Sequence, residues 1–151
     1  MNIGEICRRT VITMGEHEEL TRAAELMREQ HIGYLIVVKP NPADGTVVPV
    51  GVLTDRDIVV AVIARGADPH ALRVGEVMTR RPVVVERERP VSLALKEMRR
   101  IGVRRLPVVD HSGALVGVLS TDDVLDALAT ELWDVASSIR QEMRMEGIVR
   151  Q

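Results

Sequence analysis

The strongest constraint on the fold of this chain is an internal repeat. Leu-Ile-Val-Val at 35–38 returns as Leu-Pro-Val-Val at 106–109, which is 71 positions later. Gly-Val-Leu-Thr at 51–54 returns as Gly-Val-Leu-Ser at 117–120, only 66 positions later, because the intervening turn is longer in the first copy. A longer surface turn leaves its flanking strands in place. The sequence therefore predicts two copies of one structural unit.

Each copy has the pattern β-α-β-β-α. A short β segment is expected at 11–13 and at 83–85. A helix follows, and its apolar residues have the spacing of one helical face: Leu20, Ala23, Ala24 and Met27, then Val91, Ala94, Leu95 and Met98. A continuous apolar strand, a turn and a second strand come next, at 35–38 and 48–53 and at 106–109 and 115–119. A last helix opens at Thr54 and at Ser120.

These elements predict an α+β fold of two repeats and a C-terminal helix. A unit of about 60 residues is marginally stable alone, so we expect the two repeats to pack together with pseudo-two-fold symmetry. The expected divisions are a first repeat at 1–66, a linker at 67–74, a second repeat at 75–130 and a C-terminal helical extension at 131–151.

The composition argues against several classes of protein. The net charge of −2 does not favour nucleic-acid binding through bulk charge. No apolar run approaches the roughly 20 residues that span a bilayer, and the N-terminus lacks the pattern of a signal peptide. The single cysteine, Cys7, allows no intrachain disulfide and argues against a thiolate metal cluster. We expect a cytoplasmic protein with no membrane partner and no metal site.

One short motif occurs in both copies where the second strand ends. Thr54 is followed three residues later by Asp57, and Ser120 is followed in the same way by Asp123. One interpretation is a helix cap, because a hydroxyl and an acidic residue at this spacing form a capping box. The other is a ligand site, because a helix start favours phosphate and an aspartate accepts two hydrogen bonds from a ribose diol. The two interpretations are compatible.

The ordered set of motifs resembles a pair of CBS (cystathionine β-synthase) domains over about residues 3–130. The resemblance is carried by Gly-Val-Leu-Thr-Asp-Arg-Asp-Ile at 51–58, Gly-Glu-Val-Met-Thr at 75–79 and Leu-Pro-Val-Val-Asp at 106–110. It implies a regulatory module that binds an adenosine ligand (AMP, ADP, ATP or S-adenosylmethionine) in clefts between the repeats. It implies no required cofactor and no catalysis, and we find no catalytic arrangement in the sequence.

The resemblance also implies binding residues. Asp57 and Asp123 would hold ribose hydroxyls, with Thr54 and Ser120 beside them. The adenine would lie against the first strands, and the pockets would be completed by residues just before the second strand: Thr10, Val11, Ile12, Pro82, Val83, Gly33, Tyr34 and Val103. Arg104 or Arg105 would bind phosphate in the second copy, and Arg56 in the first. We therefore expect unequal sites, with the second copy better suited to a phosphorylated ligand.

Two features leave alternatives open. If the repeated motif only caps helices, the chain is an interaction scaffold without a ligand. Beyond the repeats, apolar residues recur at alternating spacings of three and four, as in a coiled-coil seam: Leu125, Leu128, Leu132, Val135 and Ile139. This helix either folds back over the core or contacts a partner. The resemblance implies a homodimer, and a regulatory module also needs an effector protein.

Overall fold

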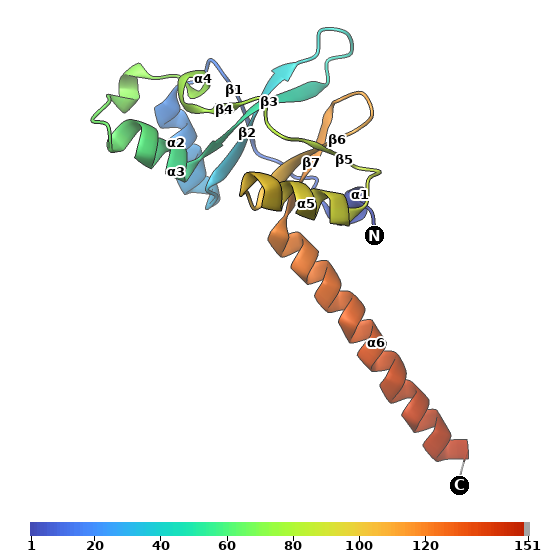
Figure 1. The fold of residues 1–151 in the computed structure, drawn as a ribbon. Coiled ribbons are helices and arrows are strands. Elements are labelled where there is room, and N and C mark those ends of the chain that lie inside the picture. The colour runs from blue at the N-terminus through green and yellow to red at the C-terminus, as the bar shows by residue number, and fades with distance from the viewer. Residues whose placement is uncertain (150–151) are drawn as a thin grey trace.

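The computed structural model describes residues 1–149, which form two similar α+β units followed by a long projecting helix (Figure 1). The first unit contains β1 (Thr13–Gly15), α2 (Leu20–Gln30), β2 (Tyr34–Pro40), β3 (Val47–Thr54), α3 (Asp55–Ile58) and a π-helical turn, η1 (Val59–Ile63). The second unit contains β5 (Val85–Glu86), α5 (Val91–Ile101), β6 (Arg105–Val109), β7 (Leu115–Ser120) and α6 (Thr121–Val149). Four short elements complete the chain: α1 (Ile3–Ile6), the 3₁₀ turn η2 (Pro69–Ala71), α4 (Val74–Val77) and β4 (Thr79–Arg80). The predicted α+β fold of two repeats with a C-terminal helix is confirmed.

The two units have sheets of the same topology. In the first, β1 runs parallel to β2, and β2 is antiparallel to β3. In the second, β5, β6 and β7 are related in the same way. The first strands begin two residues later than the expected 11–13 and 83–85. In the first unit, Thr13 is the first residue of this strand that pairs with β2, opposite Ile36.

Each unit buries its own apolar core. Leu20, Ala23 and Met27 on α2 are buried against β2, whose Leu35 is fully inaccessible to solvent. The equivalent face of α5 is buried in the second core, through Val91, Ala94 and Met98. The helical spacing of apolar residues thus identified three of the four predicted core positions in each helix, but Ala24 and Leu95 are wrong, since both are exposed at the edge of the apolar face.

The two units exchange their leading segments. Ile3 of α1 is fully buried in the core of the second unit, and Val74 of α4 is fully buried in the core of the first. The backbone N–H of Gly4 donates to the carbonyl of Arg87 at 2.8 Å, and the N–H of Gly75 donates to the carbonyl of Glu16 at the same distance. Because these contacts are related by the sequence offset of the repeat, the units are linked symmetrically.

The exchanged segments lie close against glycines of the second strands. Arg8 and Val118 exchange backbone hydrogen bonds of 2.9 Å, which adds the N-terminal segment to the edge of β7. A Cβ atom at Gly117 would lie 2.7 Å from the carbonyl oxygen of Arg8. In the first unit, Thr79 of β4 pairs with Val52 in the equivalent way, and a Cβ atom at Gly51 would lie 3.1 Å from the carbonyl oxygen of Thr79. The glycine of each Gly-Val-Leu sequence therefore admits the crossing segment.

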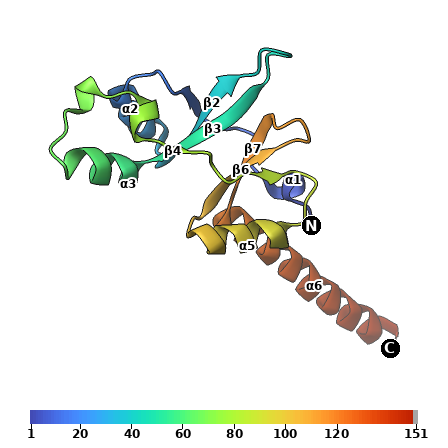
Figure 2. The ribbon, with the colours of Figure 1, turned by 45° about the horizontal axis from the view of Figure 1, so that its top comes forward.

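Helix α6 extends away from the two units rather than folding back over them (Figure 2). Within α6, only Asp123 and Val124 are buried, and both belong to its first turn. The predicted seam residues beyond this point are exposed. None of the helices within residues 1–149 combines the length and the apolar character that crossing a bilayer requires.

Candidate functional site

The repeated Thr/Ser-x-x-Asp motif forms a complete capping box in both units. The N–H of Thr54 donates to Asp57 Oδ2 at 2.9 Å, and the N–H of Asp57 donates to Thr54 Oγ1 at 3.1 Å. In the second unit, the N–H of Ser120 donates to Asp123 Oδ2 at 2.8 Å, and the N–H of Asp123 donates to Ser120 Oγ at 3.1 Å. The capping interpretation is confirmed. Since each box uses only one carboxylate oxygen, capping leaves the other oxygen for a ligand.

The two aspartates differ in the hydrogen bonding of the second carboxylate oxygen, Oδ1. Arg8 donates through Nε to Asp123 Oδ1 at 2.6 Å, whereas Asp57 Oδ1 makes no hydrogen bond with any described residue. Burial raises the pKa of Asp123, but hydrogen bonds from Ser120 and Arg8 outweigh it, so that its pKa lies below the ordinary value. Oδ1 of Asp57 is therefore available to accept a hydrogen bond from a ligand, whereas Oδ1 of Asp123 already accepts one from Arg8.

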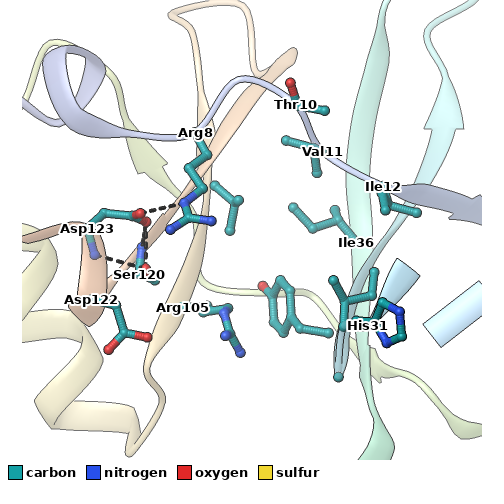
Figure 3. Close-up of a pocket in the computed structure, with 14 residues that line it drawn as sticks. Arg8, Thr10, Val11, Ile12, His31, Ile36, Arg105, Ser120, Asp122 and Asp123 are labelled. Atoms are coloured by element: carbon teal, nitrogen blue, oxygen red, sulfur yellow. Dashed lines mark hydrogen bonds and ion pairs between the residues drawn. The ribbon is translucent and has the colours of Figure 1, made fainter. Parts of the chain in front are cut away.

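Asp123 lies on a cavity of about 360 Å³ between the two units (Figure 3). On one side are Arg8, Ser120 and Asp123. Facing them across the gap are residues of the first unit and the chain leading into it, namely Thr10, Val11, Ile12 and His31. Gly33 and Tyr34 of the first unit also line this cavity. We call this cavity the Asp123 pocket.

Asp57 lies on a larger cavity of about 720 Å³, which we call the Asp57 pocket. The first unit contributes its capping box with Arg56, together with Gly33 and Tyr34. The second unit and the segment before it contribute Arg81, Pro82, Val83, Val103, Arg104 and Arg105. Its lining corresponds to that of the Asp123 pocket by the repeat, so the two cavities are related by the pseudo-two-fold symmetry.

All the binding residues inferred from the sequence line one of these two pockets. The grouping by copy, however, is wrong. The sequence analysis places Arg104 and Arg105 in one site with Asp123, but both line the Asp57 pocket, and only Arg105 also lines the Asp123 pocket. The physical reason is that each cleft lies between the units, so a motif of one repeat faces the loop of the other.

The pockets differ in charge as well as in size. Four arginines line the Asp57 pocket together with two aspartates: Arg56, Arg81, Arg104 and Arg105, with Asp55 and Asp57. In the Asp123 pocket, Arg8 and Arg105 are balanced by Asp122 and Asp123. This geometry agrees with the prediction of unequal sites. The pocket with the larger positive charge, however, contains Asp57, whereas the sequence analysis expects the second copy, with Asp123, to suit a phosphorylated ligand better.

Tyr34 and Arg105 line both pockets and occupy equivalent positions in the two repeats. The hydroxyl oxygen of Tyr34 is buried and has no hydrogen-bond partner among the described residues. Burial raises the pKa of the Tyr34 hydroxyl well above its ordinary value, so the group is neutral near pH 7. The tyrosine thus brings a hydrogen-bond donor to the wall shared by the two cavities.

The sequence analysis missed four charged residues of the pockets, namely the arginines Arg8 and Arg81 and the aspartates Asp55 and Asp122. The repeat itself indicates Arg81, because it stands 71 positions after Thr10, which is one of the predicted binding residues. Its backbone has a left-handed φ of 51°, which is uncommon for a residue other than glycine. Arg8 carried no comparable signal, since its role depends on the exchange of leading segments between the units.

The family model that describes the CBS domain matches the chain twice, at residues 3–64 and 74–130. The chain belongs to the CBS domain family. Among curated CBS relatives, an uncharacterized protein of Methanopyrus kandleri is 35% identical over 144 residues, which cover 95% of this chain and 69% of that protein.

Solved structures of other CBS proteins have the same fold. A CBS domain protein of Pyrobaculum aerophilum, complexed with AMP, superposes with a TM-score of 0.72 at 27% identity and covers 86% of this chain and 99% of that one. A hexameric CBS-CP12 protein of bloom-forming cyanobacteria superposes with a TM-score of 0.69 at 32% identity, over 83% of this chain and 69% of that one. The two units described above are therefore a CBS domain pair.

Proposed function

We propose that this CBS domain pair is a regulatory module that binds an adenosine nucleotide in the Asp57 pocket. One observation carries the proposal: an aspartate with an open carboxylate oxygen and four arginines line a single cavity between the repeats. A carboxylate accepts hydrogen bonds from a ribose diol, and guanidinium groups bind phosphate oxygens in bidentate fashion. A nucleotide presents both groups on one molecule.

The remaining walls suit an adenine ring. Pro82, Val83 and Val103 supply aliphatic surface for the faces of the ring. Apolar walls with a few polar groups are typical of small-molecule sites. The Asp57 pocket therefore combines contacts for base, sugar and phosphate. AMP, ADP and ATP all carry these three parts.

We propose that the Asp123 pocket binds a less anionic adenosine compound, such as S-adenosylmethionine, or binds nucleotide with lower affinity than the Asp57 pocket. It is smaller, its charges balance, and a diol that binds Asp123 has to displace the guanidinium of Arg8. The side chain of Arg8 is mostly exposed and can swing into solvent, but Asp123 is buried, so the ligand has to replace the hydrogen bond that Asp123 loses. A ligand here therefore competes with one side chain rather than with the fold.

Binding would act on the arrangement of the two repeats. A ligand in either pocket contacts both units, so it favours whichever arrangement it fits best by its difference in affinity. We propose that the module has no catalytic activity, forms a homodimer and transmits this shift to an effector protein. The AMP complex of the relative from Pyrobaculum aerophilum supports the ligand class, and the hexameric cyanobacterial relative supports assembly from several copies.

The proposal is tested by titration calorimetry of the full chain with AMP, ADP, ATP and S-adenosylmethionine. We expect heat with at least one nucleotide, and a loss of affinity of tenfold or more in Asp57→Asn. Asp68→Asn is the matched control, since Asp68 also caps a helix start (its carboxylate accepts from the N–H of His70 at 2.9 Å) but lies outside both pockets. A nucleotide at 100 times its dissociation constant should also add about 2.7 kcal/mol to the free energy of unfolding.

A scaffold without a ligand is the second candidate, and the complete capping boxes in both units favour it. It predicts no heat and no thermal shift with any of the four compounds. It also predicts that Asp57→Asn and Asp68→Asn affect only stability. Either result would remove the nucleotide proposal while leaving the fold and its assembly untouched.

A further inference from the structure

The two pockets share a wall to which each repeat contributes the same position. Tyr34 is the first residue of β2 and pairs with the capping residue Thr54. Arg105, which stands 71 positions later, is the first residue of β6 and pairs with Ser120 in the same way. Both side chains line both pockets, and among the described residues Arg105 is the one charged side chain that does so. Because tyrosine is neutral, this wall holds one positive charge for two pockets.

The guanidinium group of Arg105 is available to a ligand in either pocket. It lies over the ring of Tyr34 and makes no hydrogen bond or ion pair with any residue of 1–149. Arg8, by contrast, is bound to Asp123 at 2.6 Å. A guanidinium group binds a phosphate through two parallel hydrogen bonds. The bound phosphate also neutralises its charge, so that little of the charge remains to attract a phosphate in the other pocket.

A second link between the pockets acts in the same direction. Arg104 lines the Asp57 pocket, and its guanidinium group pairs at 3.1 Å with Asp122, which lines the Asp123 pocket. Both side chains of this pair are largely exposed, so the pair is readily exchanged for another partner. A phosphate in the Asp57 pocket competes with Asp122 for Arg104. The Asp123 pocket then becomes more negative and binds a second phosphate less well.

We propose that Arg105 is a phosphate-binding residue shared by the two pockets, so that a phosphorylated ligand in one pocket weakens the binding of a phosphorylated ligand in the other. This inference rests on the proposed nucleotide function and specifies the regulation of its sites. The coupling is reciprocal, because two linked binding equilibria change each other by the same factor. It also depends on ligand charge. Adenosine has the base and the ribose but no phosphate, so it leaves the charge of Arg105 to the other pocket.

The coupling is measured by titration calorimetry of the full chain with AMP. In the wild type, the second AMP enters the Asp123 pocket after the Asp57 pocket is filled. In Asp57→Asn, AMP enters the Asp123 pocket while Arg105 is unoccupied, and adding Asp123→Asn should abolish this binding, which assigns it to that pocket. We expect the affinity in Asp57→Asn to exceed that for the second AMP of the wild type by about fivefold or more. Added salt should reduce the difference, because it screens exposed charges.

Two controls attribute the difference to the shared charge. In an Arg105→Gln background, most of the difference between Asp57→Asn and its parent should disappear. Arg56→Gln is the matched control, since it removes a positive charge from the Asp57 pocket alone and should leave the difference in place. Titration with adenosine should show no such difference in any of these chains. Circular dichroism checks that each variant remains folded.

The outcomes separate this inference from the proposed function. A wild-type chain that binds one AMP, while Asp57→Asn binds it in the Asp123 pocket, is the limiting case of the coupling and supports it. Equal affinities with the Asp57 pocket filled and empty would overturn the coupling. It would also be overturned by a difference that survives in Arg105→Gln or recurs with adenosine, or by an Asp123 pocket that binds no AMP in Asp57→Asn. In each of these cases nucleotide binding itself remains, whereas a chain that gives no heat with any adenosine compound would remove the proposed function.

Discussion

The guanidinium carbon of Arg105 lies 5.9 Å from the centroid of the Tyr34 ring. The two residues occupy equivalent positions of the repeats and meet at the wall that separates the two pockets. A cation above an aromatic face is attracted by about 0.5–1 kcal/mol at exposed sites. The pair therefore links the ligand environment of one pocket to that of the other.

Arg105→Gln should lower nucleotide affinity in both pockets, because this arginine lines both cavities and supplies one positive charge to each. Calorimetry with AMP and ATP measures the effect, and we expect a loss of several-fold or more. Arg100→Gln is the matched control, since Arg100 pairs with Glu97 on the surface of α5, outside both pockets. Equal affinity of the wild type and Arg105→Gln would contradict the role assigned to this residue.

Tyr34→Phe should stabilise the ligand-free chain by about 1 kcal/mol. A buried hydroxyl without a hydrogen-bond partner costs about 1–3 kcal/mol, and phenylalanine keeps the ring that packs against Arg105. Urea unfolding of the two proteins measures the difference. A clear loss of stability in the variant would show that the hydroxyl has a partner in solution.

Asp123 should make stability depend on pH in the acid range. Its pKa in the folded chain is lowered from the ordinary value of 3.8, so its contribution is present above that pH and is lost as the pH falls through the lower, folded value. The difference in unfolding free energy between the wild type and Asp123→Asn should therefore shrink as the pH falls below about 4. Arg8→Gln should reduce this dependence, since Arg8 contributes to the shift. A difference that stays constant across the acid range would contradict the assignment.

Gly117→Ala should destabilise the chain by about 1–3 kcal/mol, the usual cost of overpacking. The new Cβ would lie 2.7 Å from the backbone carbonyl of Arg8, and a backbone atom cannot move aside as the end of a side chain can. Gly147→Ala on α6 is the control, because a Cβ at that position meets no atom within 4 Å. Thermal unfolding compares the two variants, and equal melting temperatures would refute the close approach.

The repeat made most of the fold predictable. A hydrophobic period of 3.6 residues identified the buried faces of α2 and α5, and the apolar runs identified β2 and β6 as buried strands. These features depend on residues near one another in sequence, where local patterns are informative. The capping boxes at Thr54 and Ser120 were predictable for the same reason.

The assembly of the site was not predictable in this way. Arg8 and Asp123 are 115 positions apart, and no local pattern indicates that they form an ion pair. The placement of Arg104 opposite Asp57 likewise depends on how two similar units pack against each other. Sequence identified the binding residues by type, but their division between the pockets required the three-dimensional arrangement.

The exchange of the leading segments makes each half of the chain depend on the other half for its core. Because Ile3 completes one core and Val74 completes the other, a cut after residue 66 gives two fragments that each hold the missing piece of the other. Neither half should fold well by itself, whereas the mixture should reassemble. A polypeptide made of one such half can complete its core only by exchanging its leading segment with a second molecule. A duplicated gene that joins the two halves in one chain could replace such a pair of separate chains.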